Sequence, residues 1–291
     1  MKRDTKPVKN EFFNGPRITI KKSFSLSGIG LHNGERVNIC FKPFYGCGIF
    51  FKRVDLRKKN HGKPCFVKAS VENIINTNYS IDLSKNGVLV RSVEHVLASL
   101  FGLGIDDCII ELDNEELPAL DGSGEVIVKN ILKAGFKETS RKRKIIVLKK
   151  PVAVSTNGSC IIAVPDKNFK ISVAISYRNK FIGTQYGEFN IYKKTFINEI
   201  ACARTFGWLE EIEREKKKGL IKGGSLDNAL VYSNKGLVNK EKQKFKDEPV
   251  RHKIFDLMGA LAFLPGRLNA HIAGIRTGHT IDIAFVKEVL K

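Results

Sequence analysis

The chain has 291 residues, of which 42% are hydrophobic and 27% charged, as is usual for a globular protein that buries a sizeable core. It contains no apolar run near the roughly 18 residues of a transmembrane helix, and its charged N-terminal stretch lacks the apolar segment of a signal peptide. The six cysteines are scattered without CxxC spacing, so we expect reduced thiols in a cytoplasmic protein.

The net charge of +20 raises the question of an anionic partner. The basic residues are dispersed, with short runs at 141–144 and 216–218, and no nucleic-acid motif accompanies them. We therefore expect no nucleic-acid partner. A basic surface also suits peripheral contact with an anionic membrane, but the charge alone does not choose between these partners.

In chain order, the sequence predicts two α+β units. Hydrophobic periodicity and turn residues predict a hairpin over 17–43, a helix from Ser92 as N-cap, a strand over 107–113 and a helix within 122–135. They then predict a strand pair at 145–154 and 159–165, a strand at 169–177, a helix over 249–264 and a helical run after His279. A helix, a turn and a strand thus occur in the same order twice, which indicates two similar halves. We divide the chain into a tail (1–16), a first domain (17–138), a basic linker (139–144) and a second domain (145–291).

Two potential metal ligands lie on the predicted helix 249–264. Pro249 suits its first position, and His252 and Asp256 are four residues apart, so their side chains lie on one face, one turn apart. An imidazole and a carboxylate placed in this way can share one metal ion. The alternative is an ordinary i,i+4 pair on a solvated face, which is the commoner explanation of an isolated motif of this kind.

A second group of polar residues opens the predicted helix that follows Ser92. Glu94 lies in the first turn, where the helix dipole favours a carboxylate. Adjacent helical residues point about 100° apart, so we expect His95 to bind the metal and Glu94 to act on its water. The alternative is a capping carboxylate beside a partly exposed histidine. His279 lies in a Gly-containing turn, where it is either an accessible functional group or a solvated loop residue.

Together these segments resemble the UDP-3-O-acyl-N-acetylglucosamine deacetylases, the zinc amidases of lipid A biosynthesis. The matching motifs occur in the family's order and spacing over nearly the whole chain: GIGLHNGERV at 28–37, SVEHVLASLFGLGIDD at 92–107, ELPALDGSG at 116–124, ARTFGWLEEIE at 203–213, GLIKGGSLDNALVY at 219–232, FKDEPVRHKIFDLMG at 245–259 and GH at 278–279.

The resemblance implies a role for each matching residue. His95, His252 and Asp256 would hold one zinc ion, Glu94 would be the general base for the attacking water, and His279 would be the general acid that protonates the leaving amine. Thr205 would help to stabilise the oxyanion. Substrate contacts would come from Lys253 near the phosphates, from Phe206, Ile212 and Gly224 along the groove for sugar and acyl chain, and from Tyr177 near the uracil. From its place beside a ligand on the helix, we expect Lys253 to point toward a neighbouring diphosphate and not toward the metal.

The resemblance also implies a fold and a reaction. The fold would be two similar α/β-sandwich domains with helices packed between two sheets, and segments 57–80 and 207–232 would be inserts near the substrate. The reaction would be hydrolysis of the N-acetyl amide of a UDP-linked acylated amino sugar, with release of acetate. We expect a monomer, in the cytoplasm or at the inner membrane face, where an acylated substrate can reside.

Two departures from the family pattern stand out. Ala260 occupies the position, one turn beyond Asp256, where the family usually has a carboxylate that partners the general-acid histidine; its loss should lower the pKa of His279 unless another group substitutes. Segment 73–81 also departs from the usual substrate loop. The alternative function is therefore a noncatalytic relative of the same fold that binds an anionic ligand or nucleic acid through its basic surface.

Overall fold

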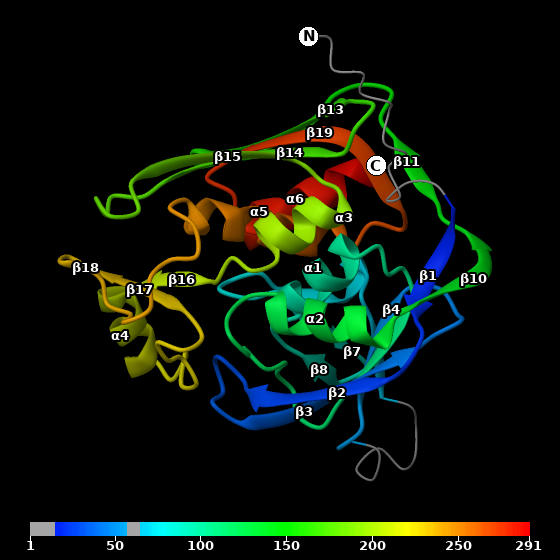
Figure 1. Cartoon of the computed structure of the whole chain (residues 1–291), viewed down its shortest axis with the longest axis horizontal. Coiled ribbons are helices and arrows are strands. Elements are labelled where there is room, and N and C mark those ends of the chain that lie inside the picture. The colour runs from blue at the N-terminus through cyan, green and yellow to red at the C-terminus, as the bar shows by residue number, and fades with distance from the viewer. Residues whose placement is uncertain (1–14, 57–64) are drawn as a thin grey trace.

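The computed structural model describes residues 15–56 and 65–291, and it consists of two β-sheets with a layer of helices between them (Figure 1). The first sheet has the order β2-β3-β9-β4-β5, with β2 (Phe24–Ile29), β3 (Arg36–Pro43), β9 (Cys108–Leu112), β4 (Ile49–Arg53) and β5 (Phe66–Lys68). The second has the order β12-β13-β19-β14-β15, with β12 (Val152–Thr156), β13 (Ser159–Pro165), β19 (Arg267–Ile275), β14 (Lys170–Ser176) and β15 (Thr184–Asn190); β11 (Ile145–Val147) also pairs with β19.

The two sheets have the same topology. In each, a central strand is antiparallel to one neighbour and parallel to the other: β9 lies between β3 and β4, and β19 lies between β13 and β14. Each neighbour continues outward into an antiparallel edge strand. The central strand follows a helix in both cases. The prediction of two similar halves with helices between two sheets is confirmed.

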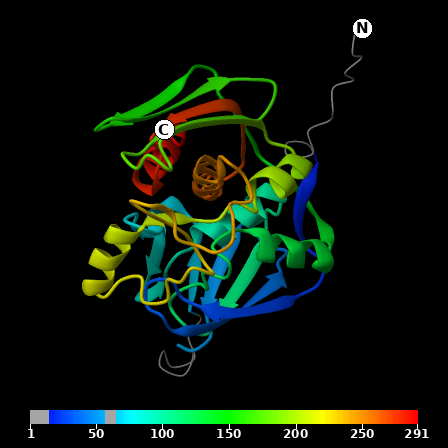
Figure 2. The same cartoon turned by 60° about the vertical axis from the view of Figure 1, so that its left-hand side comes forward.

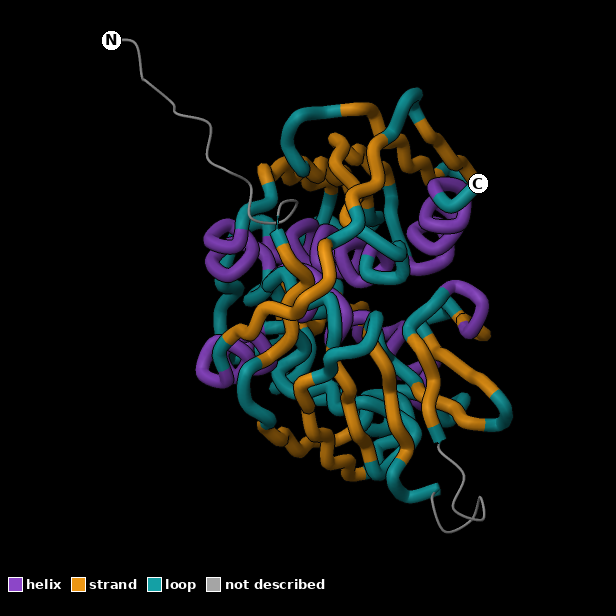
Figure 3. Tube along the Cα trace, turned by 90° about the vertical axis from the view of Figure 1, so that its right-hand side faces the viewer, coloured by secondary structure: helices purple, strands orange, loops and turns teal. Residues whose placement is uncertain are grey.

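The middle layer contains the long helices α1 (Glu94–Gly102), α2 (Glu125–Ala134), α5 (Glu248–Leu261) and α6 (His279–Val289). Figure 2 shows α5 between the two sheets, and Figure 3 shows the helices as one layer with strands on both sides. A short helix, α3 (Lys193–Thr195), continues into the π-helical turn η2 (Phe196–Ile200). No helix in the described ranges is both long enough and apolar enough to cross a membrane.

Each half also carries a small additional sheet. The first contains β6 (Ile74–Asn76), β7 (Asp82–Lys85) and β8 (Val88–Val90), preceded by the 3-10 turn η1 (Val71–Asn73). The second contains β16 (Phe206–Trp208), β17 (Leu230–Ser233) and β18 (Gly236–Leu237), with α4 (Leu209–Lys217) between its first two strands. The second set lies largely within the expected insert at 207–232. Of the first set, η1 and β6 lie within the expected insert at 57–80, whereas β7 and β8 follow it, and residues 57–64 lie outside the described ranges.

Three local predictions differ from the structure. Residues 17–26 do not form one hairpin strand, because β1 (Pro16–Ile20) pairs with the distant β10 (Phe136–Lys142) and only β2 pairs with β3. Most of the expected linker 139–144 therefore has strand structure. Ser92 is not an N-cap: its φ is 59°, its hydroxyl donates to Glu116 Oε1 at 3.1 Å, and α1 begins only after Val93.

Gly259 sets the distance between α1 and α5. A Cβ atom at this position would lie 2.5 Å from the carbonyl oxygen of Glu94, closer than real Cβ atoms approach a backbone. The absence of a side chain therefore lets the start of α1 contact the middle of α5 directly. Since α1 carries Glu94 and His95 while α5 carries His252 and Asp256, this contact brings the two predicted groups together.

We predict that Gly259→Ala destabilises the protein by about 1–3 kcal/mol, the usual cost of an overpacked contact. Helix propensity alone would favour alanine by about 1 kcal/mol. A net loss of stability can therefore be assigned to the contact between α1 and α5. Chemical denaturation of both proteins measures the difference. Gly278→Ala is the matched control, because a Cβ there meets nothing within 4 Å. Equal stability of Gly259→Ala and the unmodified protein would contradict the close approach.

Candidate active site

A cavity of about 660 Å³ lies where α1, α5 and the start of α6 meet. It brings together most of the residues singled out in the sequence, and these lining residues are Glu94, His95, Tyr177, Thr205, Phe206, His252, Lys253, Asp256 and His279. They come from both halves of the chain. The cavity is therefore a junction between the two repeated units.

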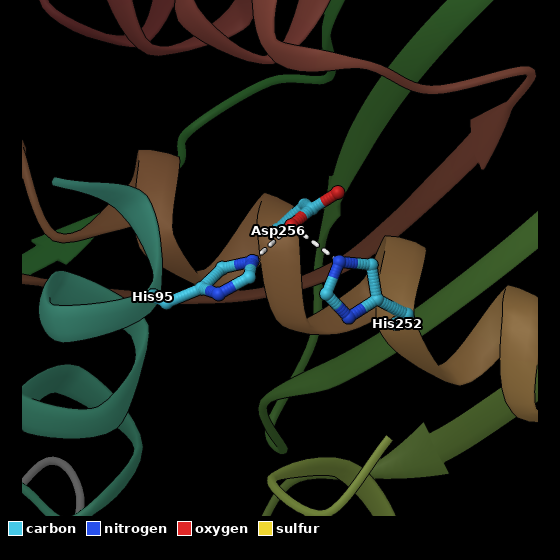
Figure 4. Close-up of side chains that lie close together, drawn as sticks. All are labelled: His95, His252 and Asp256. Carbon is cyan, nitrogen blue, oxygen red and sulfur yellow. Dashed lines mark ion pairs between the residues drawn. The ribbon is translucent and has the colours of Figure 1, made fainter. Parts of the chain in front are cut away.

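The three predicted metal ligands converge on one point (Figure 4). His252 Nε2 lies 3.3 Å from Asp256 Oδ1, and His95 Nε2 lies 3.7 Å from the same oxygen. One ligand atom from each residue lies within 4.8 Å of the other two. His252 and Asp256 are each 2% exposed in their side chains, whereas His95 is 21% exposed and faces the cavity.

This arrangement fits a metal ion. Asp256 Oδ1 is buried and has no hydrogen-bond partner in the part of the chain that the structure describes, although two imidazole nitrogens face it. The Nδ1 atom of His252 lies 3.0 Å from the carbonyl oxygen of Ala203. Donation from Nδ1 fixes the tautomer in which Nε2 has a free lone pair, as is usual for metal-binding histidines. Two imidazoles and one carboxylate are a typical donor set for catalytic zinc, which keeps its fourth position open.

Burial and charge leave the two α5 groups in the protonation states that a metal requires. Burial lowers the pKa of His252 to about 3, so its imidazole is neutral at pH 7. For Asp256, burial would raise the pKa, but the neighbouring His252 and Lys253 outweigh burial and hold it well below its usual range. His95 differs: burial opposes its charge, yet the carboxylates of Asp256 and Glu94 raise its pKa above the ordinary value.

Lys253 does not point where the sequence predicted. Its ammonium donates to Asp256 Oδ2 at 2.9 Å, so it contacts a potential metal ligand instead of pointing away from it. The two residues are three apart on α5 and are therefore neighbours on the helix surface. A buried carboxylate needs a counter-charge, and Lys253 provides one. Its ammonium also lies 5.7 Å from the centre of the Phe206 ring, at the wall of the cavity.

Glu94 lies beside the three ligands but has a different environment. It is 6% exposed, and its Oε2 accepts a hydrogen bond from the backbone N–H of Ile81 at 2.8 Å. Burial raises the pKa of Glu94 to about 7, and the nearby His95 opposes this rise. A carboxylate whose pKa lies near neutrality can both accept and release a proton at physiological pH.

His279 and Thr205 lie on other walls of the cavity. His279 is the first residue of α6, and its Nδ1 atom is buried. Burial lowers its pKa to about 4. Thr205 is held by its backbone, because its N–H donates to the Gly122 carbonyl and its own carbonyl accepts from Leu230 N–H, both at 2.8 Å. A fixed backbone gives its hydroxyl a defined position at the cavity.

The expected substrate contacts divide into two groups. Phe206 and Tyr177 line the cavity, and their ring centres are 5.5 Å apart in an edge-to-face arrangement. Ile212 and Gly224 belong to the second insert and are not among the described residues that line this cavity. Ile212 lies next to Gly207, the residue after Phe206. At Gly224 an added Cβ would lie 2.4 Å from the Ile221 side chain, so this glycine is needed by its own turn.

Part of the cavity wall comes from a segment in which the sequence singled out no individual residue. Thr77, Asn78 and Tyr79 line it, and Thr77 Oγ1 lies 2.9 Å from Thr280 Oγ1 at the start of α6. These residues belong to segment 73–81, which the resemblance placed near the substrate and whose sequence departs from the family's usual substrate loop. The Asn-Thr-Asn composition and the positive φ of Tyr79 (63°) are typical of a turn. A turn carries no periodic signal that would place it at a site.

We predict that His95 and His252 titrate very differently in the metal-free protein. The imidazole of His252 should stay neutral from pH 8 down to pH 5, because burial disfavours its charged form. His95 should stay protonated to a pH above its ordinary 6.5, because two carboxylates favour its charge. Nitrogen-15 NMR of labelled histidine over this pH range, assigned with single His→Gln variants, measures both. Two midpoints near pH 6.5 would contradict the described surroundings.

Known proteins resemble this chain over almost its whole length. Residues 17–291 match the family model described as UDP-3-O-acyl N-acetylglycosamine deacetylase (LpxC). The chain is 36% identical to the UDP-3-O-acyl-N-acetylglucosamine deacetylase of Citrifermentans bemidjiense, over 94% of this chain and 88% of that protein. It is 38% identical to the deacetylase of that name from Thermodesulfovibrio yellowstonii, over 94% and 91%, and 35% identical to that of Myxococcus xanthus, over 94% and 85%. The chain therefore belongs to the UDP-3-O-acyl N-acetylglycosamine deacetylase family.

Proposed function

We propose that this chain removes the N-acetyl group of UDP-3-O-acyl-N-acetylglucosamine, in lipid A biosynthesis, with one zinc ion held by His95, His252 and Asp256. The observation that carries this proposal is the convergence of His95 Nε2, His252 Nε2 and Asp256 Oδ1 within 4.8 Å, in a cavity that also holds a potential base and a potential acid. The family and its named relatives supply the substrate and the reaction.

The attacking water is activated on the α1 side of the cavity. When bound, zinc supplies Lewis acidity, which polarises a carbonyl and lowers the pKa of water to about 7. Glu94 takes one proton from the attacking water as its oxygen adds to the amide carbon. Ile81 N–H holds the Glu94 carboxylate in place during this step. Its pKa of about 7 suits a base that must accept a proton and later release it to solvent.

The leaving amine is protonated from the α6 side. Addition of water places negative charge on the former carbonyl oxygen, and the Thr205 hydroxyl donates a hydrogen bond to it. His279 then gives a proton to the amide nitrogen as the C–N bond breaks, because an unprotonated amine is a poor leaving group. The products are acetate and the free amine, and Glu94 and His279 return to their starting states by exchange with solvent.

The rest of the cavity binds the substrate. Lys253 contacts a phosphate oxygen of the nucleotide, and its location beside Phe206 supports this role. Phe206 and Tyr177 provide aromatic surface for the sugar and the uracil. Ile212 and Gly224 extend the groove along the second insert toward the acyl chain. The shared cavity of base, acid and ligands favours this enzyme over a noncatalytic relative, because binding alone requires neither a base nor an acid.

Zinc content and turnover should separate the ligands from the base. His252→Ala and Asp256→Ala should lose both zinc and deacetylase activity, because each removes one of three ligand atoms. Glu94→Gln should keep its zinc and lose on the order of 10²-fold or more in turnover, the usual effect of removing a positioned base. Metal analysis by mass spectrometry and an acetate-release assay measure the two properties.

The matched control is Glu288→Gln, the same chemical change on α6 at a residue that pairs with Lys291 at 2.8 Å and lies outside the cavity lining. It should keep both zinc and activity. Full zinc occupancy in Asp256→Ala would refute the ligand assignment. Unchanged turnover in Glu94→Gln would refute only the role of the base.

We further propose that the chain acts as a monomer in the cytoplasm, in peripheral contact with the anionic inner face of the membrane. The net charge of +20 supports this contact. The protein should sediment with vesicles rich in anionic lipid, and about 0.5 M salt should release it because screening shortens the range of surface charge. Vesicles of neutral lipid are the control. Equal binding to both vesicle types would contradict the electrostatic contact, and a sedimentation mass well above 32.6 kDa would contradict the monomer.

A further inference from the structure

Asp282 is a fully buried carboxylate that the proposed reaction does not yet use. It lies on α6, its exposure is 0%, and no side chain among the described residues forms a hydrogen bond with its carboxylate. Burial raises its pKa, and only the nearby backbone of Gly278 and the charge of Lys253 act to lower it. A buried polar group without a partner is costly, so each case in a folded protein requires an explanation. Asp282 is one such case at the edge of the active site.

A second unpartnered group lies one turn away on the same helix. His279 Nδ1 is buried, and it too has no hydrogen-bond partner within residues 15–56 and 65–291. Residues three apart on a helix are surface neighbours, about 5–6 Å apart at their Cβ atoms. An imidazole N–H is a donor and a carboxylate is an acceptor. The two groups are therefore complementary in chemistry and neighbours on α6; they are not hydrogen-bonded to each other in this structure, so a side-chain rotation is needed to join them.

The surroundings of this pair give it no other partner of the right kind. The charged groups that influence His279 are Asp256 and Lys253 from α5, His95 from α1 and Asp82 from β7. Asp256 is already engaged by Lys253 at 2.9 Å and by the two imidazoles that face it. Asp82 accepts from Ser80 and Ser92.

No side chain on α5 is available as a carboxylate partner for His279. The position one turn beyond Asp256 is Ala260, which is fully buried and has no polar side chain. Lys253 is near enough to influence Asp282, but its ammonium donates to Asp256 instead. Among the described residues, the buried carboxylate nearest to His279 in sequence that lacks a side-chain partner is Asp282, on α6 itself.

We propose that Asp282 is a positioning residue for the reaction: its carboxylate accepts the Nδ1 hydrogen of His279 and thereby turns Nε2 toward the leaving amine. This inference rests on the proposed role of His279 as the general acid. Before the reaction, His279 and Asp282 together carry one proton more than they would as a neutral imidazole and an ionised carboxylate. That proton moves from Nε2 to the amine nitrogen, while Nδ1–H stays bonded to Asp282. Solvent restores the Nε2 proton after the products leave.

The electrostatics of the two groups agree with a shared proton. Burial raises the pKa of Asp282 well above its usual range, and the charge of Asp256 adds to this rise. Burial has the opposite effect on His279 and lowers its pKa to about 4. Burial thus disfavours the charged form of each group. Together they can hold one proton without net charge, as either a neutral acid and imidazole or an ion pair.

The first test uses the unmodified, zinc-loaded protein. Nitrogen-15 NMR of labelled histidine should show the His279 ring with a hydrogen-bonded Nδ1–H, and the ring should keep its extra proton to near pH 7. The His279→Gln variant assigns the signal. A His279 ring that loses this proton near pH 4, as burial alone would dictate, would overturn the proposal without any change at Asp282.

The second test is Asp282→Asn, which keeps the size of the side chain and removes its charge. The alkaline limb of the kcat/KM profile should move to lower pH by about one unit or more, the usual effect of losing a close opposite charge. The His279 midpoint by NMR should move in the same direction. Zinc content and KM at low pH should stay unchanged. Glu288→Gln is the control on the same helix, and its profile should match that of the unmodified protein.

The outcomes separate this inference from the proposed function. If His279→Gln retains full activity, the general-acid role fails, and the proposed function fails in that respect. If His279→Gln is inactive while the Asp282→Asn profile and His279 midpoint match those of the unmodified protein, only the inference about Asp282 is overturned. A thermal melt of Asp282→Asn shows whether it folds; if it does not, the NMR measurement on the unmodified protein decides.

Discussion

The contact between α1 and α5 at Gly259 is the constraint on which the site depends. Neither half of the chain holds three ligands: α1 contributes His95, and α5 contributes His252 and Asp256. A side chain at 259 would clash with the backbone of Glu94, so the glycine lets the two helices approach closely where the three atoms meet. Duplication of the helix–turn–strand unit thus gives two helices of the same kind, and one missing side chain lets them share a site.

Charged groups are buried around the same contact, and two of them have a specific neighbour. Lys253 balances Asp256 on α5, and Ile81 N–H binds Glu94 on the α1 side. Desolvation works against each of these charges. Nearby charges outweigh it at Asp256 and Lys253, whereas burial prevails at Glu94 and raises its pKa. The result is a cavity in which the neutral imidazole of His252 and the ionised carboxylate of Asp256 coexist at pH 7. A divalent cation fits this balance, because its charge offsets carboxylates that the protein alone leaves only partly compensated.

The sequence could reveal the local chemistry but not the long-range geometry. His252 and Asp256 were predictable because helical periodicity alone places them on one face, and motif resemblance added His95, Glu94 and His279. The pairing of β1 with β10 was not predictable, because it joins segments more than a hundred residues apart. Gly259 looked like an ordinary helical glycine, and Asp282 like one polar residue in a helical run. Their importance depends on what packs against them, which periodicity does not encode. The direction of Lys253 was mispredicted for the same reason.

A second contact between the two halves lies near the C-terminal end of α1. Arg267 begins β19, directly after the turn that follows α5, and it donates to the carbonyl oxygens of Phe101 and Ile105 at the end of α1. Asp106, in the turn after α1, binds both Arg267 and Arg143. The equivalent turns of the two repeats are therefore tied by buried ion pairs. Such pairs add little net stability, because desolvation offsets their attraction, but a misplaced partner is strongly penalised.

Two contacts, one at Gly259 and one at these turns, fix both the distance and the angle between α1 and α5. A site assembled from two halves needs both quantities fixed, since an error in either would separate His95 from Asp256.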